Sequence, residues 1–209
     1  MSYLLRVELP DVPGSLGRLA SAIGSAGGNI DAIEIVERTQ GLATDDVFLA
    51  AEAGVMPDSI VSACTALEDV RVLWISRYAA GSNLTRDLEV VEAMTSAPDA
   101  ARDTLVDLLP ATFVVDWAVR VRRVGDGAKL VHGSAAAPTE IPDDMHWPAD
   151  LERGGRIEVP ERMSQMLVAG CSFEEDEMIA IARRGGPEIL DSEIARLRHL
   201  SALAASISN

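Results

Sequence analysis

Two short polar motifs near the N-terminus contain residue types suited to holding a small zwitterion. They are Asp11-Val12-Pro13-Gly14 and Gly27-Gly28-Asn29. The first lies where a strand is expected to give way to a helix, whose free backbone N–H groups can receive a carboxylate. Gly14 has no side chain to keep a ligand away from that backbone. Asp11 could pair with an ammonium group, and Asn29 offers a donor and acceptors. Together these groups fit a free amino acid.

Each of these residues also has a structural explanation that involves no ligand. Pro13-Gly14 is by itself an ordinary turn, and Gly27-Gly28 is an ordinary helix stop. Asn29 could satisfy nearby backbone groups, and Asp11 could cap the helix and bind nothing. The residues alone leave both explanations open.

Phosphate-loop chemistry does not fit the glycines of this region. The segment contains no G-x-x-x-x-G-K-[ST] motif and no lysine, and the G-x-G-x-x-G fingerprint is absent as well. The chain carries 33 acidic and 18 basic residues, a net charge of −15. A surface this acidic repels phosphate backbones and anionic lipids, so no nucleic-acid or membrane partner is expected.

Periodic patterns predict the elements that must position the two motifs. The alternating apolar residues from Tyr3 to Leu9 are typical of a half-buried strand, which Pro10 ends. Apolar spacings of three and four between Leu16 and Ala26 predict a helix after the turn. The remaining expected elements are strands at 30–36, 47–51 and 70–75 and a helix that starts at Met56. This β-α-β-β-α-β order within 80 residues predicts a ferredoxin-like unit.

The run DVPGSLGRLASAIGSAGGNI, placed between the first two strands, resembles the signature of the ACT domain family. ACT domains are ferredoxin-like modules that bind amino acids and regulate amino-acid metabolism. The resemblance covers residues 1–80, and its most specific part is D-x-P-G-x-L, a helix, and then G-x-N-I. It implies that this domain binds an amino acid.

ACT domains usually pair, with ligands at the joint, so the resemblance also implies a homodimer. By this analogy the turn of one chain faces the start of the second strand of its neighbour. The ligand-binding residues expected from the resemblance are Asp11, Val12, Pro13, Gly14, Ser15, Leu16, Asn29, Ile30 and Asp31.

The second half begins after a hinge of small residues, Ala79-Ala80-Gly81-Ser82-Asn83. The sequence assigns residues 81–97 to a linker that holds a helix from Leu84, and residues 98–209 to a second domain. The expected elements of that domain are a helix from Pro98, strands at 112–124, 129–132, 166–170 and 178–182, and a terminal helix carrying Ile189 to Ile207. Residues 135–162 are rich in Pro, Gly and charge, with few apolar anchors, which predicts a long irregular segment.

The closing run MIAIARRGGPEILDSEIARLRHLSALAASI is similar to the end of a GAF domain, where the last strand passes through a basic glycine-rich turn into a terminal helix. The resemblance implies a C-terminal α/β domain with a central antiparallel sheet. Residues 135–162 depart from the family, because they are too short for the helices that wall the usual GAF ligand pocket. A dimerising or scaffolding role is therefore expected at least as much as ligand binding.

Residues that would indicate catalysis or metal binding are scattered. The three histidines, at 132, 146 and 199, have no metal-ligand spacing, and Cys64 and Cys171 lie far apart without a CxxC partner. No G-x-S-x-G or nucleophile–base spacing is present. No metal, cofactor or catalytic residue is expected, and two reduced thiols and the absence of a signal-peptide pattern favour the cytoplasm.

These observations predict a non-catalytic, two-domain α+β protein that senses an amino acid at its ACT domain interface. The helix from Leu84 would carry the effect of binding to the second domain. The alternative is a regulatory or scaffolding subunit that uses both domains for dimerisation and for binding an unidentified partner enzyme, without a small ligand.

Overall fold

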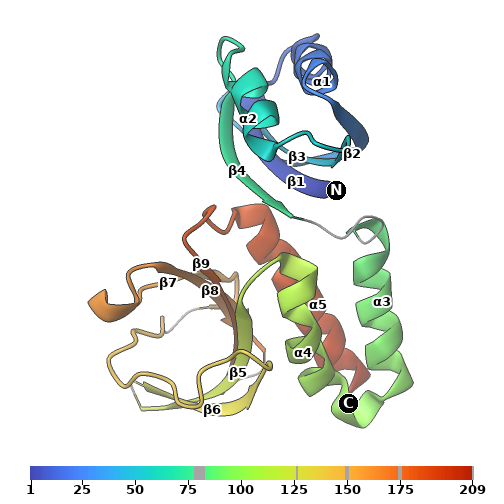
Figure 1. Ribbon diagram of the computed structural model, residues 1–209. Coiled ribbons are helices and arrows are strands. Elements are labelled where there is room, and N and C mark those ends of the chain that lie inside the picture. Colours follow the sequence, from blue (N-terminus) through green and yellow to red (C-terminus); the bar gives the residue numbers. More distant parts are fainter. Residues whose placement is uncertain (78–82, 126, 149–150, 174–175, 209) are drawn as a thin grey trace. The chain divides into compact units, whose positions relative to one another are not determined.

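A computed structural model of the chain describes residues 1–77, 83–125, 127–148, 151–173 and 176–208 (Figure 1). The chain divides into two compact units, Met1–Ser82 and Asn83–Asn209. Each unit contains its own antiparallel sheet. The hinge expected at residues 79–83, apart from Asn83, lies outside the described residues, as do Asp126, Glu174 and Glu175.

The first unit has the ferredoxin-like order predicted from its sequence. Its elements are β1 (Ser2–Pro10), α1 (Ser15–Ser25), β2 (Gly28–Thr39), β3 (Leu42–Ala51), α2 (Pro57–Thr65) and β4 (Arg71–Arg77). The strands lie in the order β2-β3-β1-β4, and every neighbouring pair is antiparallel. The predicted α+β class is confirmed.

Period-2 alternation decides which side chains of this sheet enter the core. Tyr3, Leu5, Val7 and Leu9 of β1 pack with apolar side chains of both helices. Leu5, Leu19 of α1 and Ile60 of α2 have no exposed surface. Burying a side chain of this size contributes about 1.5–3 kcal/mol, so this layer supplies much of the stability of the unit.

The two glycines after α1 are required by close packing. Gly27 has φ of +83°, and a Cβ built on it would lie 2.7 Å from Cγ2 of Val55. A Cβ on Gly28 would lie 2.7 Å from Cγ2 of Ile23 and 3.2 Å from the carbonyl oxygen of Ile23. The structural explanation of this pair therefore holds: Gly27 ends the helix and Gly28 allows β2 to pass beneath it.

Replacing Gly28 with alanine is expected to destabilise the first unit by about 1–3 kcal/mol, because the added methyl group overpacks the core. Gly24→Ala is the matched control. Gly24 lies within α1, and a Cβ there meets nothing within 4 Å, so alanine should stabilise by up to about 1 kcal/mol. Urea unfolding measures both, and equal stability of the two variants would contradict this account.

The second unit is an antiparallel sheet with three helices. Its elements are α3 (Asn83–Ser96), α4 (Ala101–Phe113), β5 (Trp117–Val124), β6 (Gly127–Gly133), β7 (Gly155–Ile157), β8 (Met166–Ser172), β9 (Glu177–Arg184) and α5 (Asp191–Ile207), with a short 3-10 turn at Pro98–Ala100. The strand order is β6-β5-β9-β8-β7. None of the helices in the described part of the chain has the length and apolar character of a membrane span.

Both faces of this second sheet are covered. Helices α4 and α5 pack on one face, over Ala118, Ile179 and Ile181, and α3 packs against these two helices (Figure 1). On the other face, Met145 and Trp147 lie with Trp117, Val119 and Val121 of β5 in a second apolar cluster. The expectation of few apolar anchors in residues 135–162 is wrong, because Met145, Trp147, Leu151 and Ile157 are all buried.

Two elements differ from the sequence prediction. The strand expected from Thr112 starts at Trp117, because α4 continues to Phe113 and ends at Val114, whose φ is +53°. The short strand β7 was not predicted. The helix expected from Leu84 is present as α3, and its Val90 and Met94 are buried in the core shared with α4 and α5.

Candidate functional site

The turn between β1 and α1 presents an uncapped helix start. Gly14 precedes α1 with φ of 93° and ψ of −14°, and no side chain caps the helix. The alternative in which Asp11 caps α1 is therefore wrong. The backbone N–H groups of Leu16 and Gly17 donate to no acceptor among the described residues. These N–H groups at the positive end of α1 are suited to receiving a carboxylate.

Asp11 pairs with an arginine that the sequence reasoning did not single out. Nε of Arg38, near the end of β2, lies 3.1 Å from Oδ2 of Asp11. Both side chains are well exposed, at 58% for Arg38 and 43% for Asp11. The backbone N–H of Asp11 also donates to the carbonyl oxygen of Gly41 at 2.9 Å. The turn is thus held against the β2–β3 hairpin by one backbone bond and one surface ion pair.

Two polar side chains are buried beneath this turn without partners. Ser15 is 3% exposed and lies on the stripe of α1 that carries Leu19 and Ile23 into the core. Asp45 of β3 is 1% exposed and shares its strand face with Val47, which points toward the helices. In the part of the chain that the structure describes, neither the Ser15 hydroxyl nor either carboxylate oxygen of Asp45 has a hydrogen-bond partner.

Burial raises the pKa of the Asp45 carboxyl above its ordinary value of 3.8, because the charged form loses its hydration. The positive charge of Arg38 partly offsets this effect, and the negative charges of Asp11 and Asp46 add to it. Sequence reasoning missed Asp45 because it started this strand at Val47. The available signal was period-2 register, since position 45 falls on the same face as positions 47, 49 and 51.

Asn29 lies far from the turn within one chain. It pairs with Ala50 of β3, which in turn pairs with Ser2 at the start of β1, whereas Asp11 follows the end of that strand. The eight residue steps from one end of β1 to the other, at about 3.4 Å each, separate the two ends by roughly 27 Å. The expectation that the turn and Asn29 together hold one amino acid is wrong within a single chain.

The expected ligand-binding residues therefore form two groups at opposite ends of the sheet. Asp11, Val12, Pro13, Gly14 and Leu16 are exposed around the start of α1, with Ser15 buried beneath them. At the start of β2, Asn29 and Asp31 are exposed and Ile30 is half-buried against the core.

Apolar side chains are exposed along the edge of the sheet beside the turn. Strand β2 is an edge strand, and its Ile33 and Ile35 are 36% and 39% exposed (Figure 1). Val12 and Leu16 of the turn region and Leu42 at the start of β3 are also exposed, at 55%, 36% and 39%. An open strand edge flanked by apolar side chains is suited to contact with another protein surface.

A cavity of about 690 Å³ lies at the other end of the first unit from the α1 turn. It is lined by residues at the start of β1, in the β3–α2 connection and at the end of β4, including Tyr3, Glu52, Val55 and Arg77. None of the expected ligand-binding residues lines it.

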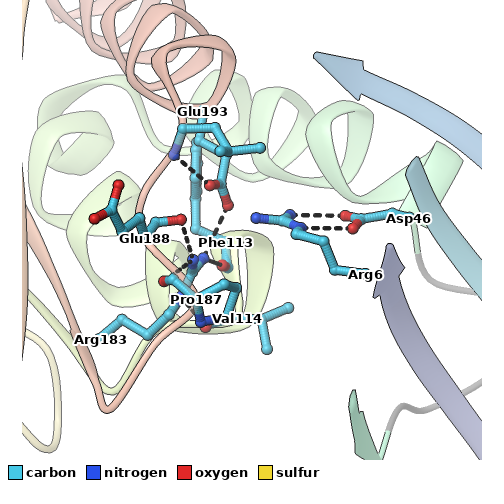
Figure 2. Close-up of polar contacts among 9 residues, drawn as sticks. Arg6, Asp46, Phe113, Val114, Arg183, Pro187, Glu188 and Glu193 are labelled. Carbon is cyan, nitrogen blue, oxygen red and sulfur yellow. Dashed lines mark hydrogen bonds and ion pairs between the residues drawn. The ribbon is translucent and has the colours of Figure 1, made fainter. Parts of the chain in front are cut away.

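The second unit contains a buried polar cluster with a structural role (Figure 2). Nη2 of Arg183 lies 2.8 Å from Oε1 of Glu193, and both side chains are buried. The same guanidinium donates to the carbonyl oxygens of Phe113, Val114 and Pro187 at 2.8, 3.2 and 3.1 Å. Arg183 thus ties the end of α4 and the segment before α5 to strand β9.

Neither cysteine has the surroundings of a nucleophile. Both are free and buried, and burial raises the pKa of the Cys64 and Cys171 thiols to about 11. The Cys171 thiol donates to Oγ of Ser201 at 3.4 Å. Within the described residues, no three His, Cys, Asp or Glu side chains are placed to hold a metal ion.

Comparison with known proteins identifies the first unit. A sequence model of the family "ACT domain" matches residues 3–63. No curated protein matches the sequence.

Among solved structures, the chain is similar to the GAF domain of the Acinetobacter phosphoenolpyruvate-protein phosphotransferase, with 9% identity over 60% of this chain and 91% of that one and a TM-score of 0.45. The GAF domain of the Coxiella burnetii phosphoenolpyruvate-protein phosphotransferase has 12% identity over 61% and 95%, with a TM-score of 0.42. A protein assigned as a glycine cleavage system transcriptional repressor has 11% identity over 91% and 85%, with a TM-score of 0.31.

The family match, the β-α-β-β-α-β order and the Asp-x-Pro-Gly turn before α1 all fall in the same segment of the chain. The N-terminal unit of this protein is an ACT domain.

Proposed function

We propose that this protein is a non-catalytic regulator that binds a free amino acid at the turn before α1. The observation that carries the proposal is the helix start itself. It is uncapped, the N–H groups of Leu16 and Gly17 have no acceptor in the described chain, and Gly14 leaves the backbone accessible. This geometry is suited to a carboxylate, and Asp11 and Arg38 supply charges of both signs beside it.

The second half of the proposed site comes from a neighbouring chain in a homodimer. Asn29 lies roughly 27 Å from Asp11 in one chain, and Asp31 follows it by two residues near the same end of β2, so both reach a ligand at the turn only from a second copy. The open edge of β2 and the exposed Ile33 and Ile35 support pairing on this side of the sheet. Two free buried thiols support a cytoplasmic location.

Thermal unfolding with each of the twenty amino acids at millimolar concentration tests the proposal. A ligand present at about 100 times its dissociation constant should add roughly 2.7 kcal/mol, which raises Tm by several degrees. Asp11→Ala and Asn29→Ala should each abolish the shift. Asp58→Ala is the matched control, since Asp58 is exposed in the first turn of α2 and belongs to neither group of expected ligand-binding residues. No shift with any amino acid would contradict the proposal.

The exposed apolar edge supports a second candidate function. A scaffolding subunit would use this surface for dimerisation and for a partner enzyme, without a small ligand. Indifference to all twenty amino acids, together with copurification of an enzyme in a fixed stoichiometry, would favour this candidate. Substituting Ile35 with lysine would then release the enzyme, because it places a charge in the middle of the apolar set formed by Val12, Leu16, Ile33, Ile35 and Leu42.

A further inference from the structure

We propose that Asp45 is the anchor for the ammonium group of the ligand, with the hydroxyl of Ser15 as a second acceptor. This inference rests on the proposed amino-acid function and names a residue that the turn motif does not contain. Asp45 and Ser15 come from β3 and α1, and both are more than nine-tenths buried. Within the described part of the chain, all three of their side-chain oxygen atoms lack a hydrogen-bond partner.

A buried carboxylate without a partner is unusual, because folded proteins satisfy nearly all of their buried polar groups. The neighbouring residue shows the ordinary arrangement. Asp46 points to the opposite face of β3 and accepts two hydrogen bonds from Arg6, at 2.6 and 2.8 Å (Figure 2). Asp45 has the same chemistry and a similar burial, but its partner is missing. The geometry thus leaves a position for a cationic donor at Asp45.

The charges around Asp45 also favour a cation. Its electrostatic neighbours are Arg38, Asp11 and Asp46. Asp46 is neutralised by Arg6, and Arg38 is held by Asp11. Asp45 is therefore the carboxylate of this group that no cation pairs with. A single ammonium group would balance the cluster and could donate both to Asp45 and to the hydroxyl oxygen of Ser15.

A zwitterion carries one charge for each partner of the ion pair beside this site. The ion pair between Arg38 and Asp11 lies on the surface and is exposed to solvent, so separating it costs little. The carboxylate of the ligand would pair with Arg38 or accept hydrogen bonds from the N–H groups of Leu16 and Gly17. The ammonium group of the ligand would then replace the guanidinium of Arg38 beside Asp11 and Asp45. The class of ligand is then a small molecule with both a carboxylate and a free primary ammonium group.

The inference requires that the ligand carry an ammonium group. An analogue that lacks the ammonium group, such as the corresponding carboxylic acid, would leave Asp45 without a partner and bind weakly. Asp45→Asn should reduce the affinity of the amino acid by about 10- to 100-fold, since a hydrogen bond to a charged group is lost. Ser15→Ala should reduce it less, because the hydroxyl is uncharged. Asp58→Asn is the control and should leave affinity unchanged.

The experiment combines calorimetry with NMR on the full chain. Calorimetric titration uses the amino acid that raises Tm and its analogue without the ammonium group, on wild type and on Asp45→Asn. In parallel, the side-chain carboxyl ¹³C resonance of Asp45 is followed during titration with ethylammonium chloride and with sodium acetate. The inference expects Asp45→Asn to weaken the amino acid and to leave the analogue unchanged. It also expects ethylammonium, and not acetate, to shift the Asp45 resonance.

The outcomes separate this inference from the proposed function. If an amino acid binds wild type and Asp45→Asn equally well, the amino-acid function stands and the role of Asp45 is overturned. If no amino acid binds but ethylammonium shifts the Asp45 resonance, the cation site stands and the amino-acid function is overturned. If neither ligand has any effect, both are overturned.

Discussion

Replacing Arg183 with methionine should destabilise the second unit by about 3–5 kcal/mol, the cost of removing one partner of a buried ion pair. The side chain of Glu193 is only 10% exposed and would lose the guanidinium that pairs with its buried charge. The carbonyl oxygens of Phe113, Val114 and Pro187 would also lose a donor. Single substitutions with so large an effect are rare, and this one combines two of the known causes.

Calorimetric melting of the full chain measures this effect. For a unit of this size the loss corresponds to a fall in Tm of roughly 10–20 °C.

Arg184→Met is the matched control, since Arg184 is the next residue of the same strand and its side chain is exposed. It should change stability by less than about 0.5 kcal/mol. The double variant Arg183→Met/Glu193→Leu should recover part of the loss, because it leaves no unpaired charge. A fall of only one or two degrees for Arg183→Met would contradict the structural role of the pair.

Changing Asp45 to asparagine and changing the adjacent Asp46 to asparagine should have effects of opposite sign on the free energy of unfolding. Asp46→Asn leaves the buried guanidinium of Arg6 without its carboxylate, so a loss of about 3 kcal/mol is expected. Asp45→Asn removes a buried negative charge that has no hydrogen-bond partner, so a gain of about 1 kcal/mol is expected at neutral pH. The same chemical change is made at both positions, and only the local partners differ.

The gain from Asp45→Asn should depend on pH. Because the pKa of Asp45 is raised in the folded protein, the folded state holds the proton more tightly than the unfolded state. The wild type therefore loses stability as pH rises from 3.8 through the folded-state pKa, and asparagine removes this loss. The advantage of Asp45→Asn should be full at neutral pH and should fade as pH falls toward 3.8.

Urea unfolding of the wild type and both variants at several pH values between 3.5 and 7 tests this pair of predictions. The midpoints should lie in the order Asp46→Asn, wild type, Asp45→Asn at pH 7. If both variants are destabilised at pH 7, Asp45 has a partner that stabilises its charge, and the ammonium site inferred from its isolation also fails.

Local patterns in the sequence predicted much of the first unit correctly. Alternation from Tyr3 to Leu9, the helix spacing from Leu16 to Ala26 and the stop at Gly27-Gly28 are all properties of neighbouring residues. Each was read from a few positions, and together they predicted the ferredoxin-like order that the structure confirms. The turn from Asp11 to Gly14 was found in the same way, because Pro and Gly mark such turns directly.

The second unit was predicted less well where contacts are not local. Met145 and Trp147 follow no helix or strand period, and the segment around them is polar in composition. Only the folded sheet shows that these side chains cover its second face, against Trp117 and Val121. The helix from Leu84 was predicted together with its apolar stripe, but the stripe does not reveal that α4 and α5 lie against it.

The sequence by itself determined a first unit of ACT type with an Asp-x-Pro-Gly turn before its first helix, and a strongly acidic composition. Tertiary structure decided that this helix start is uncapped and which groups lie near it. Strand pairing placed Asn29 at the far end of the sheet, and it buried Asp45 on the face of the sheet that the helices cover. The physical reason is that periodicity depends on a residue and its near neighbours, whereas strand register brings together residues such as Val7 and Asp45 that lie far apart in the chain.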